Sequence, residues 1–118
     1  MKIFIIGSVR GADETFRNRM EHYVKNLENN GHSVHLPHRD TDQNVKGFDI
    51  CIQNMEAIKN SDEVHIFYRA DSQGSHFDLG ITFVLNKRIK VIESPVYGEG
   101  KSFPRMLHEW QNKFLKGN

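Results

Sequence analysis

Residues 74–80 read Gly-Ser-His-Phe-Asp-Leu-Gly, and the rest of the chain can be organised around them. They follow a strand-like apolar run, residues 64–68, and lead into an apolar run with helical character, residues 79–85. A strand that feeds a helix through a small polar turn places that turn at the carboxyl edge of an α/β sheet, where such folds bind ligands. We expect Ser75 to cap this helix and Asp78 to lie in its first turn, where the helix dipole favours the ionised carboxylate. The stretch therefore predicts that Asp78 faces a pocket as a reactive or sugar-facing carboxylate.

Asp78 also has a purely structural interpretation. Its spacing from Ser75 fits a capping box, with aspartate in place of the usual glutamate. Helix caps far outnumber active sites, so this spacing alone favours a cap. A functional role for Asp78 therefore depends on what the fold brings next to it.

A second turn with glycines follows the strand-like residues 2–6. It consists of Gly7, Ser8, Val9, Arg10 and Gly11. The glycines allow a close approach of the backbone, while the hydroxyl of Ser8 and the charged fork of Arg10 suit a phosphate group. The turn lacks the Gly-Lys-Ser/Thr of a P-loop and the G-x-G-x-x-G of a dinucleotide site. The alternative is an ordinary strand-to-helix turn with a solvated arginine.

Strand-like and helix-like runs alternate along the chain. Strands are expected at residues 2–6, 32–36, 63–68 and 89–92, helices at 13–30, 48–60, 75–86 and 103–115, and a polar loop that borders a site at 37–47. This order predicts an α/β protein with a three-layer flavodoxin/Rossmann-like fold, a parallel sheet of four or five strands flanked by helices. We expect the first strand to lie beside the third. The turns after them then meet at a topological switch point, in one site that contains Ser8, Arg10, Ser72, Gly74 and Asp78.

Two further sets of polar residues need an interpretation. Asn54 lies at the edge of the buried face of the helix over residues 48–60, so its side chain must bond either a backbone group or a group in the site. His32, His35 and His38 invite a metal site, but strand alternation sends the first two to opposite faces, and no carboxylate or cysteine accompanies them. We expect neither a metal nor a cofactor.

The composition restricts the class of protein. The chain has 118 residues, a formal net charge of +1 and a single cysteine, Cys51. This length predicts one domain over residues 1–118 with a modest core, for which a homodimer would be unsurprising. The balanced charge argues against a nucleic-acid polymer as partner, the lone cysteine fits a reducing compartment, and no apolar run reaches membrane-spanning length. We expect a cytoplasmic protein that binds a small molecule rather than a membrane.

The sequence resembles the nucleoside 2-deoxyribosyltransferase superfamily, and most of all its branch of 2′-deoxynucleoside 5′-monophosphate N-glycosidases. The resemblance covers residues 2 to about 92 and rests on the segments 7–11, 54–62 (NMEAIKNSD), 74–80 and 86–89. It implies that Asp78 stands at the position of the family's glutamate nucleophile, which attacks the anomeric carbon of the sugar. It also implies that the Gly7–Gly11 turn, through Ser8 and Arg10, and Ser72 bind the 5′-phosphate. The full set that we predict to bind the substrate or its phosphate is Gly7, Ser8, Arg10, Gly11, Ser72, Gly74 and Ser75.

The chain departs from the family pattern at four positions. The family's catalytic aspartate on the second helix is Asn54 here, and its tyrosine on the first strand is Phe4. The nucleophile position, Asp78, is one methylene shorter, and the second glycine of the motif is His76. Asn54 can orient a hydroxyl or a base edge but cannot act as a general base. His76 is either an accessory proton donor, since imidazole titrates near neutrality, or a solvated residue at a helix start.

The resemblance implies an enzyme that hydrolyses the N-glycosidic bond of a (deoxy)nucleoside 5′-monophosphate and releases the base. One alternative is a non-catalytic nucleotide-binding or regulatory protein of the same fold, which the changes at Phe4, Asn54 and Asp78 favour. The other is a nucleoside deoxyribosyltransferase, against which the phosphate-binding turn argues mildly.

Overall fold

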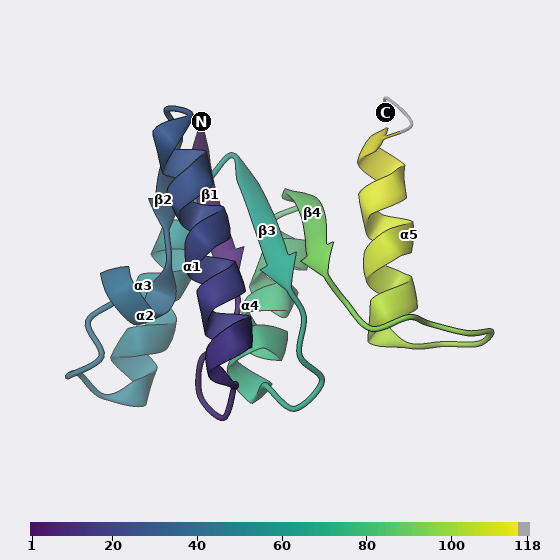
Figure 1. Ribbon diagram of the computed structural model, residues 1–118, viewed down its shortest axis with the longest axis horizontal. Helices are drawn as coiled ribbons and strands as arrows, with labels where there is room; N and C mark the ends of the chain where they lie inside the picture. Colours follow the sequence, from purple (N-terminus) through teal and green to yellow (C-terminus); the bar gives the residue numbers. More distant parts are fainter. Residues whose placement is uncertain (116–118) are drawn as a thin grey trace.

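The computed structural model describes residues 1–115, which form three layers (Figure 1). The middle layer is a parallel sheet of four strands in the order β2-β1-β3-β4. The strands are β1 (Lys2–Ile6), β2 (Ser33–His35), β3 (Glu63–Phe67) and β4 (Arg88–Glu93). The expected α/β fold, its parallel sheet and the pairing of the first strand with the third are confirmed.

Helices cover both faces of the sheet. They are α1 (Glu14–Asn29), the short α2 (Pro37–Asp40), α3 (Gly47–Lys59), α4 (Gln73–Val84) and α5 (Phe103–Leu115). Helix α1 lies on one face, α3 and α4 lie on the other, and α5 stands beside β4 (Figure 1). No helix within residues 1–115 is long and apolar enough to cross a bilayer.

The alternation of side chains along β1 explains the two apolar layers. Ile3 and Ile5 point to the face under α1, where they meet Met20. Phe4 and Ile6 point to the opposite face and join the cluster that α3, α4 and α5 complete. Burial on both faces is typical of a central parallel strand, and the unbroken apolar sequence of residues 2–6 reflects it.

Helix α4 begins earlier than expected. Ser72, not Ser75, is the N-cap: its Oγ accepts the Ser75 backbone N–H at 3.1 Å. Serine is a preferred N-cap residue, so the sequence pattern allowed either Ser72 or Ser75 as the cap. Asp78 therefore lies in the second helical turn and not in the first, beyond the reach of the exposed N–H groups at the helix start.

The expected loop at residues 37–47 begins with a helical turn, α2. Pro37 occupies its first position, where a missing N–H is harmless, and the Asp40 carboxylate accepts the Leu36 backbone N–H at 2.8 Å. A proline followed three residues later by aspartate is a sequence signal for a helix start. The polar composition of the segment favoured a loop instead, so this helical turn was not predicted. The turn still borders the site, because Pro37 and His38 line the cavity there.

Candidate active site

A cavity of about 620 Å³ opens at the carboxyl ends of β1 and β3. The β1–α1 turn, the segment after β2, helix α3 and the start of α4 form its walls. Nine residues predicted for the site line it together: Gly7, Ser8, Arg10, Gly11, Asn54, Ser72, Gly74, Ser75 and Asp78. Gln43 and Ile50 also line it, and no pattern in the sequence predicts either of them as a site residue.

Asp78 is the buried carboxylate of this cavity. It is only 7% exposed, and desolvation by burial raises its pKa from 3.8 to about 7. This reverses the expectation of a carboxylate kept ionised by the helix dipole. No hydrogen bond joins its carboxylate oxygens to another residue in the described part of the chain. These oxygens are also not fully enclosed, since the enclosed side-chain atoms without a partner do not include them. The carboxyl group therefore meets the cavity itself.

The start of α4 presents hydrogen-bond donors to the same cavity. Ser72 Oγ accepts the Ser75 N–H and donates its own proton to Ser75 Oγ at 2.9 Å. The hydroxyl proton of Ser75 therefore remains available, whereas that of Ser72 is engaged. The backbone N–H groups of Gln73 and Gly74 belong to the first helical turn and have no partner inside the helix. An anion at this point would meet two N–H groups and one O–H group.

The β1–α1 turn needs its glycines for two different reasons. A Cβ atom at Gly7 would lie 2.4 Å from Sδ of the fully buried Met20, so any other residue would force the Met20 side chain to move. Gly11 has φ +72°, in the left-handed region that side chains disfavour. The side chain of Arg10 is exposed at the cavity and bonds no other described residue.

Arg69, for which no sequence pattern predicts a role in the site, joins the two turns. One guanidinium nitrogen, Nη1, donates to the carbonyl oxygens of Ser8 at 3.0 Å and Arg10 at 2.9 Å. The other, Nη2, donates to Asp71 Oδ2 at 2.9 Å. Arg69 follows β3 and lies about sixty positions from the carbonyl groups that it holds, so no local pattern announces the contact. Below we call these three hydrogen bonds the Arg69 clamp.

The two accessory residues lie outside the cavity lining. Phe4 is fully buried under the sheet face and stacks on the His35 ring, with centroids 5.3 Å apart. His76 turns toward α5: its ring bonds the Tyr68 hydroxyl at 2.9 Å and the Ser72 carbonyl at 2.6 Å, and it packs edge-on against Phe103. These contacts are structural, and they place the imidazole on the side of Tyr68 rather than in the cavity.

The histidines at positions 32, 35 and 38 diverge. His32 contacts the N-terminal amine, His35 contacts Thr41, and His38 contacts Glu21. Among residues 1–115, no three histidine, cysteine or acidic side chains gather in a way that could hold a metal ion.

A second hollow of about 660 Å³ is lined by Arg69, the start of α1 and the end of β4. Its main charged groups, Arg19 and Glu93, bond each other through two hydrogen bonds of 2.6 and 3.0 Å. Asp78 does not line it. The buried carboxylate of Asp78 therefore belongs to the smaller cavity.

No protein-family model matches the chain, and no curated protein does either. Among solved structures, the CMP N-glycosidase of Clostridium botulinum matches with a TM-score of 0.69 and 21% identity, over 95% of this chain and 84% of that one. The 2-deoxyribosyltransferase of Bacillus psychrosaccharolyticus matches with a TM-score of 0.69 and 18% identity, over 83% of this chain and 77% of that one. At these identities the likeness concerns the fold, and this chain has the fold that the N-glycosidase and the deoxyribosyltransferase share.

Proposed function

We propose that the protein is a divergent, single-domain member of the nucleoside 2-deoxyribosyltransferase superfamily that hydrolyses the N-glycosidic bond of a (deoxy)nucleoside 5′-monophosphate. One observation carries the proposal: a single cavity is lined by a buried carboxylate, Asp78, and by the Ser8–Arg10 turn with the donors at the start of α4. The cavity of about 620 Å³ lies within the ordinary range for small-molecule sites.

The phosphate end of the substrate would lie between the two turns. The Arg10 guanidinium supplies a charged donor, and the Ser8 and Ser75 hydroxyls supply neutral ones. The free N–H groups of Gln73 and Gly74 add the partial positive charge of a helix start. The phosphate thereby anchors the nucleotide, and the Arg69 clamp keeps the backbone of its binding turn in place.

The sugar would lie over Asp78. In its ionised form this carboxylate attacks the anomeric carbon or stabilises the positive charge that develops there. The C–N bond breaks, and its electron pair leaves with the base, which takes a proton from water. In the covalent version, water then cleaves the glycosyl ester, which frees the sugar phosphate and restores Asp78. In the other version, the hydroxide left from the water that protonates the base bonds directly to the anomeric carbon and gives the same products. A neutral Asp78 cannot perform either role, so the raised pKa makes the reaction depend on pH.

Incubation with a panel of nucleoside 5′-monophosphates, ribose and deoxyribose forms of each base, is expected to release free base from at least one. Chromatography of the products measures this release. The Asp78→Ala variant should lose at least about a thousandfold in rate, because a covalent or electrostatic role of this kind is concentrated in one group. Equal release by Asp78→Ala, or none by the wild-type protein, would contradict the proposal.

Two further arms separate the alternatives. The Arg10→Ala variant should raise KM for the monophosphate roughly ten- to a hundredfold, the value of a charged hydrogen bond, and leave KM for the matching nucleoside unchanged. Added acceptor base tests for transfer, since a deoxyribosyltransferase would form a new nucleoside. Binding seen by calorimetry without any product would indicate the nucleotide-binding alternative, which the asparagine at position 54 favours.

We also propose that the protein is a cytoplasmic homodimer. The outer sides of the adjacent helices α3 and α4 carry large exposed apolar side chains, among them Phe48 at 76%, Phe77 at 52% and Val84 at 83% exposure. Such a surface is typical of an interface. Light scattering after size-exclusion chromatography should give twice the mass of the chain, and Val84→Lys should shift the population toward the monomer. A wild-type protein with the mass of one chain at micromolar concentration would refute the dimer.

A further inference from the structure

Asn54 does not stand alone at the cavity wall. It is 8% exposed, and its Oδ1 accepts a hydrogen bond of 2.7 Å from Thr41 Oγ1. Thr41 is itself 4% exposed, and its Oγ1 lies 2.9 Å from His35 Nε2. These three side chains come from α3, from the end of α2 and from β2. They form a continuous chain of hydrogen bonds that ends at the cavity.

The direction of this chain follows from counting protons. A threonine hydroxyl has one proton, and Thr41 gives it to Asn54. His35 must therefore donate from Nε2 to Thr41 Oγ1. Burial lowers the pKa of His35, so the ring is neutral and carries its only N–H at Nε2. Phe4 stacks on this ring with an interplanar angle of 8° and holds its plane.

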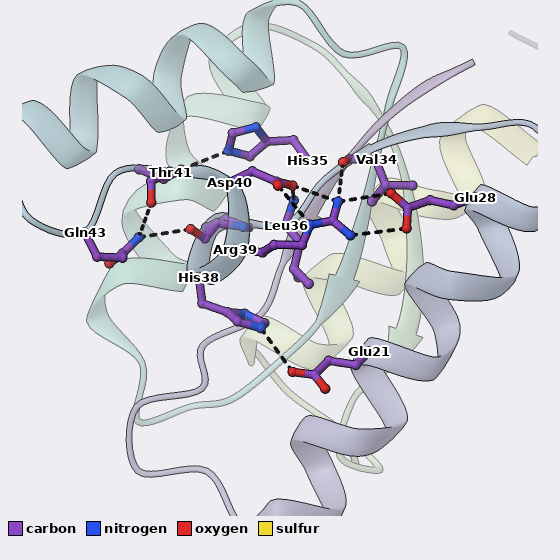
Figure 2. Close-up of polar contacts among 11 residues, drawn as sticks. Glu21, Glu28, Val34, His35, Leu36, His38, Arg39, Asp40, Thr41 and Gln43 are labelled. Atoms are coloured by element: carbon purple, nitrogen blue, oxygen red, sulfur yellow. Dashed lines mark hydrogen bonds and ion pairs between the residues drawn. The ribbon is translucent and has the colours of Figure 1, made fainter.

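Thr41 is fixed from its backbone side as well. Arg39 donates to the Val34 carbonyl and to the carboxylates of Glu28 and Asp40, which ties α2 to α1 and β2 (Figure 2). Gln43 Nε2 donates to the Thr41 carbonyl at 3.1 Å, a contact that Figure 2 also shows. The hydroxyl of Thr41 is thus held at a set position instead of following a mobile loop.

The amide nitrogen of Asn54 is the free end of the chain. It bonds no other residue in the described part of the protein. If it were also fully enclosed, it would be a buried polar atom without a partner, and His38 Nδ1 is the only such atom among the described residues. The Asn54 nitrogen is consequently not enclosed, and Asn54 lines the cavity. Its N–H groups face the space where a ligand would lie.

We propose that Thr41 and His35 are positioning residues that lock the Asn54 amide with its oxygen toward Thr41 and its N–H groups toward the cavity, so that this wall recognises a hydrogen-bond acceptor of the substrate. The identity of the substrate as a nucleotide rests on the proposed function, whereas the orientation of the amide does not. An aspartate at position 54 would offer an acceptor or an acid. The locked asparagine offers donors only, which suits a hydroxyl or carbonyl oxygen of the sugar or base.

The test compares Thr41→Val, which keeps the shape of the side chain and removes the hydroxyl, with Thr41→Ser, which keeps the hydroxyl. The ¹⁵N shifts of the His35 ring should show the Nε2–H tautomer in the wild type and in Thr41→Ser, and this signature should change in Thr41→Val. Addition of CMP and dCMP as probes should shift the Asn54 side-chain NH₂ signals in the first two proteins and not in the third. With a substrate that is turned over, kcat/KM should fall roughly ten- to a hundredfold in Thr41→Val, as expected when a buried partner is lost, and within about threefold in Thr41→Ser.

The outcomes are separable. An Nδ1–H tautomer of wild-type His35 would overturn the proposal, because the chain would then run toward the histidine. Unchanged kcat/KM in a folded Thr41→Val would overturn it too. So would an Asn54 signal that does not move when calorimetry shows that CMP or dCMP is bound. Should no nucleotide be hydrolysed while the tautomer and the ligand-induced shift are as expected, the hydrolytic function fails and the orientation of the amide stands. If Thr41→Val does not fold, the tautomer and Asn54 signals of the wild type and of Thr41→Ser decide the matter.

Discussion

At pH 8 the Asp78→Asn variant is expected to be more stable than the wild-type protein. Burial raises the pKa of Asp78 from 3.8 to about 7 in the folded state. The unfolded chain ionises this group at its ordinary value, so the folded protein loses stability relative to the unfolded chain as pH rises from about 4 to about 7. A shift of about three units corresponds to a loss of at most about 4 kcal/mol. A neutral asparagine of the same shape removes this cost.

Denaturant unfolding at pH 4, 6 and 8 measures the effect. The difference in free energy of unfolding between Asp78→Asn and wild type should be small at pH 4, where both side chains are neutral in the folded state and the unfolded aspartate has only begun to ionise. It should grow to roughly 2–4 kcal/mol at pH 8. Glu109→Gln, exposed in the middle of α5, is the control and should stay within about 0.5 kcal/mol at every pH. A stability difference for Asp78→Asn that does not grow with pH would show that the carboxylate is not held in an unfavourable environment.

The rate of base release is expected to rise with pH through about 7. Below the raised pKa of Asp78 the carboxyl group is mostly neutral, and only its ionised form can attack or stabilise the anomeric carbon. Because kcat/KM reports the ionisation of the free enzyme, it should fall about tenfold for each pH unit below 7 and level off above it. A pH-rate profile between pH 5 and 9 with a monophosphate substrate measures this.

The substrate has its own titration, because a phosphate monoester loses its second proton near pH 6. Following the substrate by ³¹P NMR across the same range separates the two events, and the matching nucleoside, which lacks the phosphate, provides a second control. A kcat/KM that falls as pH rises through 7 would mean that the protonated carboxyl acts as an acid, contrary to the role assigned to Asp78.

The fold could be predicted from the sequence because its strands and helices follow from the spacing of apolar residues that are near neighbours in the chain. The apolar run of residues 2–6, the helical spacing of Phe16, Met20 and Val24, and the short connections between them all depend on near neighbours. The convergence of the Ser8–Arg10 turn and Asp78 then followed from the order of parallel strands.

The parts that sequence reasoning missed depend on distant or equivalent groups. Arg69 donates to the backbone carbonyl groups of residues 8 and 10 on another turn. Because every residue has a backbone carbonyl, the residue types at these two positions do not predict the contact. Ser72 and Ser75 are the same residue type, so either could cap α4. Only the point at which the backbone becomes helical identifies Ser72 as the cap. The link from Thr41 to Asn54 crosses a loop whose polar composition gave no hint of a fixed position.

The Arg69 clamp also has a consequence for engineering. It grips the main chain of the β1–α1 turn and leaves the side chains of Ser8 and Arg10 outside its hydrogen bonds. Combinatorial libraries at these two positions should therefore yield mostly folded proteins, in which the preference for one phosphate-bearing or phosphate-free ligand over another can be reselected while the scaffold is retained.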